Sequence, residues 1–95
     1  MKKISYNITV SKGKNQIELK QVNGYLLVKD GVKYGIDHRN KYYGWIISEL
    51  RTGRKVDGAG SLHEAVEIVT DELNEKVKEI LSRNETILVN DIDNL

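Results

Sequence analysis

The chain has 95 residues, with fifteen Lys or Arg against fourteen Asp or Glu, no cysteine and no proline. Without cysteine there are no disulfides or thiolate metal ligands, so stability must come from apolar burial and backbone pairing, and the cytoplasm is the expected compartment. No apolar run approaches the roughly 20 residues of a membrane helix. We therefore expect one domain, residues 1–95, that does not contact membranes.

The N-terminal segment is predicted to be a strand. Apolar residues occupy every second position from 4 to 10, which places them on one face of an extended chain. The same alternation interrupts the continuous apolar stretch that a signal peptide needs. The residues of this face are Ile4, Tyr6, Ile8 and Val10.

Two turn dipeptides then predict a meander. Asn23-Gly24 and Asp30-Gly31 both tolerate the positive φ angles of a tight type I′ hairpin. The strands that these turns would delimit span residues 16–22, 25–29 and 32–38 and, after a polar turn at 39–41, residues 42–51. The first 58 residues are therefore expected to form an antiparallel sheet.

A helix is predicted next, over residues 61–83. Ser61 and Glu64 have the spacing of a capping box, in which Glu64 reaches back to the Ser61 N–H. Apolar residues then follow at steps of three and four, a stripe that must lie on the sheet. They are Leu62, Val66, Val69, Leu73, Val77 and Ile80. The expected fold class is α+β: an antiparallel four- to five-stranded β-meander with one long helix packed on the sheet and a short C-terminal strand at 86–90.

Charge is divided along the chain. Residues 1–55 hold twelve Lys or Arg against four Asp or Glu, a balance of +8, and residues 56–95 hold three against ten, a balance of −7. The acidic strip of the predicted helix has two interpretations: an ordinary solvated face, or a surface that imitates a nucleic-acid backbone and occupies a partner's phosphate-binding groove. Its members are Glu64, Glu67, Asp71 and Glu75.

The basic half contains a candidate surface of its own. Residues 38–45 interleave Arg39 and Lys41 with Tyr42, Tyr43 and Trp45. Single-stranded nucleic acid binds to such combinations, because its bases stack on aromatic rings and its phosphates contact the cations. If the strand alternates, Trp45 and one tyrosine must point into the core, which reduces the stacking surface. Further cations follow at the next turn: Arg51, Arg54 and Lys55.

The sequence offers no pattern typical of an enzyme. A zinc helix of the H-E-x-x-H kind needs two histidines, whereas His63 is followed four residues later by Glu67. The serines lack a nucleophile-elbow pattern, and thiol catalysis requires the absent cysteine. The glycine-rich run 53–60 lacks the lysine of a phosphate-binding loop, so its glycines are expected only to turn the chain. We expect no catalytic residue, cofactor or metal.

One stretch, residues 44–67, resembles the strand, turn and helix start of HicB-type antitoxin domains. The resemblance rests on Trp45, Ile47, Gly60, Ser61, Leu62, Glu64 and Ala65. It implies a sheet with one packed helix and a surface that binds a toxin protein.

The chain as a whole is similar in type to small products of Gram-positive phages and conjugative plasmids, among them anti-CRISPR and anti-restriction inhibitors. That likeness implies a protein that binds a nuclease or its guide complex without doing chemistry. The preferred hypothesis is thus a non-enzymatic binding protein of a mobile genetic element, inhibiting a host CRISPR nuclease or its guide RNA complex. A HicB-like antitoxin and a small nucleic-acid-binding protein are the alternatives.

Overall fold

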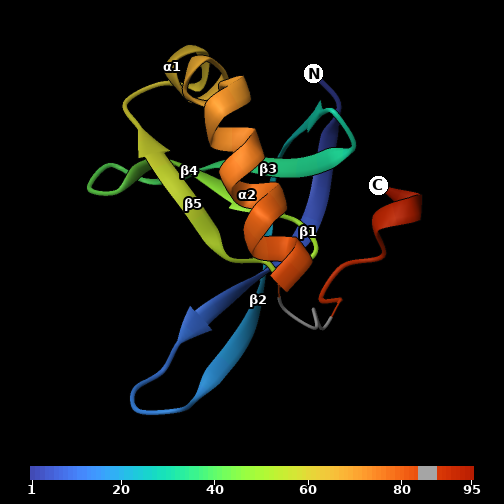
Figure 1. Ribbon diagram of the computed structural model, residues 1–95. Helices are drawn as coiled ribbons and strands as arrows, with labels where there is room; N and C mark the ends of the chain where they lie inside the picture. Colours follow the sequence, from blue (N-terminus) through green and yellow to red (C-terminus); the bar gives the residue numbers. More distant parts are fainter. Residues whose placement is uncertain (84–87) are drawn as a thin grey trace.

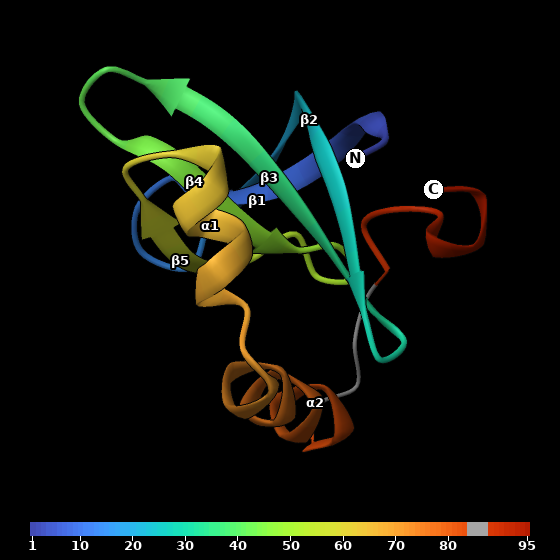
Figure 2. The ribbon, with the colours of Figure 1, turned by 90° about the horizontal axis from the view of Figure 1, so that it is seen from above.

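The computed structural model, described for residues 1–83 and 88–95, confirms the α+β class and the antiparallel meander (Figure 1). Within these residues one five-stranded sheet has the order β1-β2-β3-β4-β5, and two helices lie on one side of it (Figure 2). The elements are β1 (Lys3–Ser11), β2 (Ile17–Lys29), β3 (Val32–Asn40), β4 (Gly44–Glu49), β5 (Lys55–Ala59), α1 (Leu62–Ile68), α2 (Asp71–Arg83) and a 3₁₀ turn, η1 (Ile92–Asn94).

The strand β2 is longer than predicted because the turn expected at Asn23-Gly24 does not form. The first part of β2 pairs with β1 and its last part pairs with β3. A Cβ on Gly24 would lie 2.4 Å from the Ile36 carbonyl oxygen, so glycine serves here for close approach and not for a turn. The turn predicted at Asp30-Gly31 is confirmed, with φ angles of 47° and 80°.

The limits of two further strands also differ from the prediction. The turn expected at 39–41 lies one to two residues later, so β4 begins at Gly44. The glycine-rich run 53–60, expected only to turn the chain, contains the strand β5. The sheet therefore has five strands, within the four to five predicted for the meander, although two of them differ from those predicted.

The sheet is covered on both faces. On the face toward the helices, Tyr34, Ile36 and Ile47 are fully buried and pack with α1. On the other face of the sheet, Tyr6 packs within a second cluster of buried apolar side chains. Its ring lies so close to Gly35 that a Cβ there would lie 2.4 Å from the Tyr6 Cζ, so only glycine fits at this position of β3.

The single helix predicted over 61–83 is wrong, because the chain breaks at Val69 and Thr70. Val69 has non-helical angles, φ −77° and ψ 73°. The Thr70 Oγ1 then accepts from the Leu73 N–H at 3.2 Å and caps a second helix. Asp71 in the first turn favours this new start electrostatically.

One of the two hydrogen bonds of the capping box predicted at Ser61 and Glu64 is confirmed. The Ser61 Oγ accepts from the Glu64 N–H at 3.1 Å. The returning bond differs, since the Glu64 carboxylate accepts from the Gly60 N–H at 3.2 Å instead of the Ser61 N–H. The start of α1 is thus fixed by its own sequence.

The C-terminal strand predicted at 86–90 lies partly outside the described residues, and 88–90 are not a strand. In place of strand pairing, the Asn90 side chain accepts from the Asn7 N–H at 2.6 Å and donates to the Asn7 carbonyl at 2.9 Å. It also donates to the Leu50 carbonyl at 2.8 Å. One buried amide therefore covers the outer edge of β1, as a neighbouring strand would.

Candidate functional site

The acidic helical surface consists of Glu64, Glu67, Asp71 and Glu75. All four residues are exposed, as predicted. The break at Thr70 divides them, so that two carboxylates belong to α1 and two to α2 (Figure 2). The continuous strip expected on one helix is therefore two shorter pairs on two helices.

Basic side chains lie beside three of these four carboxylates. His63 Nε2 lies 2.8 Å from Glu67, Lys29 Nζ lies 3.2 Å from Asp71 and Lys78 Nζ lies 3.6 Å from Glu75. Exposed ion pairs of this kind are weak and screened by salt, and the Asp71 side chain stays 98% exposed. Between residues 62 and 83 the chain has six Asp or Glu and three Lys or Arg, so the helical layer keeps an excess of negative charge.

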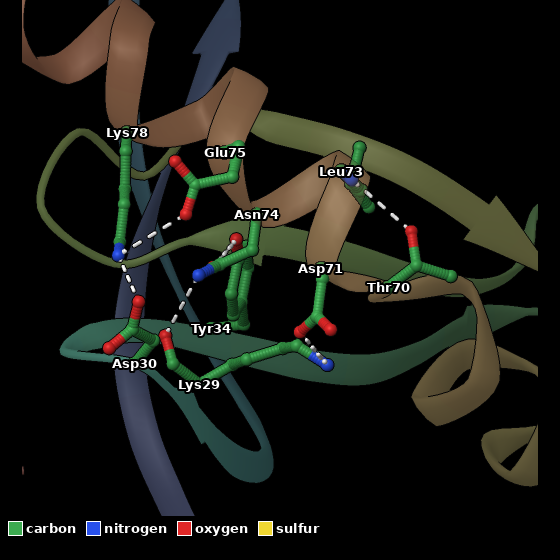
Figure 3. Close-up of polar contacts among 9 residues, drawn as sticks. All are labelled: Lys29, Asp30, Tyr34, Thr70, Asp71, Leu73, Asn74, Glu75 and Lys78. Carbon is green, nitrogen blue, oxygen red and sulfur yellow. Dashed lines mark hydrogen bonds and ion pairs between the residues drawn. The ribbon is translucent and has the colours of Figure 1, made fainter.

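One edge of α2 is fastened to the β2–β3 hairpin by polar contacts, which we call the α2 tether (Figure 3). At its centre is Asn74, only 2% exposed, which accepts from the Tyr34 hydroxyl at 2.6 Å and donates to the Lys29 carbonyl at 3.2 Å. Lys78 pairs with Asp30 beside it. The members of the tether are Lys29, Asp30, Tyr34, Asp71, Asn74 and Lys78.

The pKa values of three members of the α2 tether are shifted. Burial, with a smaller contribution from the Glu49 carboxylate, raises the pKa of Tyr34 to about 12. The hydrogen bond from Lys78 lowers the pKa of Asp30, and the same bond raises the pKa of Lys78. Sequence reasoning missed Asn74, although an asparagine between Leu73 and Val77 on an apolar stripe was a signal that a buried polar contact would be needed.

The basic turn, Arg51, Arg54 and Lys55, joins β4 to β5 and is exposed as predicted. The turn is held in place by the side chain of Glu49, a residue that is 3% exposed. The Glu49 carboxylate accepts from the Arg51 N–H at 2.6 Å, the Thr52 N–H at 2.9 Å and the Thr52 hydroxyl at 2.8 Å. A buried acceptor with three donors fixes the turn, so its cations project from a rigid base.

The tip of the β3–β4 hairpin presents two tyrosines to solvent. The Asn40 Oδ1 accepts from the backbone N–H groups of Tyr42 and Tyr43, both at 2.8 Å. The two side chains are 88% and 61% exposed, and their rings lie edge to face with centroids 5.0 Å apart. The prediction that one of them points into the core is wrong, because both precede β4. Trp45 is partly buried against the core, as predicted.

The two cations predicted beside these tyrosines have different surroundings. Arg39 is bonded through Nε and Nη2 to the buried Asp37 carboxylate, both at 2.9 Å, which raises the Arg39 pKa. Tyr6 also donates to Asp37, at 3.3 Å, and its pKa is raised above the ordinary range chiefly by burial. Lys41 is exposed at the tip. Arg39 therefore compensates a buried charge, and Lys41 is the cation that a ligand at the tip would meet.

Neither described helix is long and apolar enough to cross a membrane. In residues 1–83 and 88–95, no three His, Asp or Glu side chains are grouped closely enough to hold a metal ion. Comparison with known proteins found no matching family model, no similar curated protein and no similar solved structure. Functional inference therefore depends on the surfaces described above.

Proposed function

We propose that this chain is a non-enzymatic binding protein of a mobile genetic element that inhibits a host CRISPR nuclease or its guide RNA complex. The observation that supports this proposal most is the acidic helical surface. Its four carboxylates are all exposed and none belongs to the apolar core. Glu64 also caps α1 and Asp71 belongs to the α2 tether, whereas Glu67 and Glu75 pair with side chains on their own helices. A protein that binds nucleic acid carries a basic groove to which such a surface is electrostatically complementary.

In this mechanism the acidic helical surface occupies the groove that otherwise holds the phosphate backbone. Its attraction steers association and weakens as salt rises. The basic turn contacts an acidic protein patch or the guide RNA, and its rigid attachment through Glu49 limits the ordering cost of that contact. No bond is made or broken, so inhibition is stoichiometric.

The direct test replaces all four carboxylates of the acidic helical surface with lysine and measures co-purification with a purified CRISPR nuclease, with and without guide RNA. We expect complex formation to be lost while the circular dichroism spectrum keeps its helical and sheet features. Unchanged capture by the quadruple variant would refute the acidic mechanism.

A matched control keeps the same kind of charge change away from the helices. Glu18 and Asp93 are both exposed and lie on β2 and η1. The double variant Glu18→Lys, Asp93→Lys should bind like the wild type and should be compared with Glu67→Lys, Glu75→Lys. Equal losses in the two double variants would indicate a nonspecific effect of net charge.

A second candidate function, binding of single-stranded nucleic acid, is favoured by the hairpin tip. Two exposed tyrosines and Lys41 combine stacking faces with a cation. In a gel-shift salt series with single-stranded DNA and RNA, this function predicts a shift that salt weakens and that Tyr42→Ala, Tyr43→Ala removes. If the wild type gives no shift, this candidate is excluded.

A further inference from the structure

A groove of about 730 Å³ lies between α2 and the sheet, on the side of the helix away from the α2 tether. Its volume falls within the range of roughly 300 to 1,000 Å³ that is usual for ligand sites. Apolar side chains supply much of its lining: Val56 from β5 and Leu73, Val77, Ile80 and Leu81 from α2.

The polar contacts that fasten α2 lie along the edge opposite the groove. Lys29, Asp30 and Tyr34 hold that edge through the α2 tether (Figure 3). Ile80, predicted to lie on the sheet, is instead 56% exposed at the groove. Ile17, contributed by β2, is 66% exposed at the same place. Large apolar side chains gathered in an open groove are typical of a docking site.

Cations lie on both walls of the groove. Arg54 and Lys55 belong to the β4–β5 side, and Lys76 belongs to α2. Within the described residues, Arg54 and Lys55 form no ion pair, whereas Lys76 lies 3.6 Å from Glu72. The acid that lines the groove, Glu49, already accepts three hydrogen bonds. The charge offered to an occupant is therefore positive.

From this arrangement we propose that the groove binds an acidic amphipathic helix of a partner protein. The apolar stripe of that helix would enter between α2 and β5, and carboxylates on its two flanks would meet Arg54 and Lys55 on one wall and Lys76 on the other. Helix-in-groove recognition of this kind uses apolar anchors at i, i+3, i+4 and i+7. The groove is separate from the acidic helical surface, but it shares Arg54 and Lys55 with the basic turn. Peptide binding tests the groove whether or not the protein inhibits a nuclease.

The positions of the cations favour a helix over other occupants. A fatty acid carries a single carboxylate and would satisfy one wall only. A second copy that inserted its own α2 would bring Lys76, Lys78 and Arg83 along with the carboxylates of that helix, so it would be less complementary to a positive groove. An acidic helix supplies negative charge on both flanks together with an apolar stripe.

The probe is a fluorescein-labelled synthetic peptide of about 15 residues with leucine at helical anchor positions and glutamate on both flanks. Fluorescence anisotropy with the full chain should show saturable binding. A peptide with lysine in place of each glutamate should bind at least about tenfold more weakly, a difference of about 1.4 kcal/mol. Absence of saturable binding to the glutamate peptide would overturn the proposal.

Two variants test the walls and the floor separately. Arg54→Glu, Lys55→Glu removes the charge of one wall, and Ile80→Asp places a charge on the apolar floor. Both sets of side chains are exposed, so the fold should be kept, and circular dichroism checks this. Each variant should weaken peptide binding about tenfold or more. Lys2→Glu, an exposed charge reversal at the N-terminus, should bind like the wild type.

Two further outcomes would contradict the proposal. Equal affinity of the wild type and Arg54→Glu, Lys55→Glu for the glutamate peptide would show that the cations do not select the occupant. Analytical ultracentrifugation of the protein alone should show a monomer. A dimer that Ile80→Asp dissociates would assign the groove to a second copy of the chain.

Discussion

The two helices are attached to the sheet by different kinds of contact. α1 packs through apolar side chains, and Ala65 at its centre is fully buried against a core that includes Ile36 and Ile47. α2 also contributes Val77 to the core, but its fastened edge depends on Asn74 and on ion pairs with the β2–β3 hairpin. α1 therefore completes the core, whereas polar contacts fasten α2 at one edge and a groove borders the other.

The largest expected effect comes from the α1 side of this comparison. Ile47→Ala removes three methyl or methylene groups from a fully buried site and should lower the free energy of unfolding by about 2 to 5 kcal/mol. Urea denaturation followed by circular dichroism measures the change. Val28→Ala, at a site 52% exposed, is the matched control and should cost far less. Similar losses of unfolding free energy in the two variants would show that Ile47 does not belong to the core.

On the α2 side, Asn74→Ala should cost about 1 to 3 kcal/mol because it leaves the buried Tyr34 hydroxyl without its acceptor. The double variant with Tyr34→Phe should cost less than the sum of the two single changes, since both remove the same bond. Urea denaturation of all four proteins completes the cycle. Strict additivity would mean that this bond does not hold α2.

Alkaline pH should loosen the same contact. The Tyr34 hydroxyl has a pKa of 10.0 in the unfolded chain and of about 12 in the folded chain, so only the unfolded state releases its proton between these values. Its stabilising contribution is complete below pH 10 and is lost as the pH rises to 12. The free energy of unfolding should fall more steeply over this interval in the wild type than in Tyr34→Phe. Parallel curves would contradict the raised pKa.

The smallest effect is expected for the exposed ion pair of Lys78 and Asp30. Lys78→Ala should lower the midpoint of thermal unfolding only slightly in dilute buffer, and less still at high salt, because screening weakens exposed pairs. Lys76→Ala, which removes a pair confined to α2, is the matched control for loss of a lysine. A large effect of Lys78→Ala that is independent of salt would mean that Lys78 stabilises the α2 tether by packing of its methylene groups and not through the ion pair.

The features that the sequence predicted correctly are set by local chemistry. The apolar alternation of β1, the turn at Asp30-Gly31 and the cap at Ser61 each depend on neighbours within a few residues. The chain order of an antiparallel meander then follows from short connections. Local patterns of this kind need no knowledge of distant contacts.

The features that it missed depend on contacts distant in sequence. Asn23-Gly24 has the composition of a turn, but the close approach of Ile36 requires glycine in an extended strand. The break at Thr70 had a local signal, a threonine before two acids, which the apolar stripe running through it concealed. The α2 tether joins residues forty or more positions apart, so the pairing of Asp71 with Lys29 could not be predicted from the sequence of the helix alone.

The central claim, stoichiometric inhibition through the acidic helical surface, is tested most directly by DNA cleavage. Residual cleavage by a purified CRISPR nuclease with its guide RNA is measured against increasing molar ratios of this protein. We predict complete inhibition at an equimolar ratio for the wild type, and uninhibited cleavage with the variant that carries four lysines in place of Glu64, Glu67, Asp71 and Glu75. Uninhibited cleavage with the wild type, or complete inhibition far below one equivalent, would contradict the account.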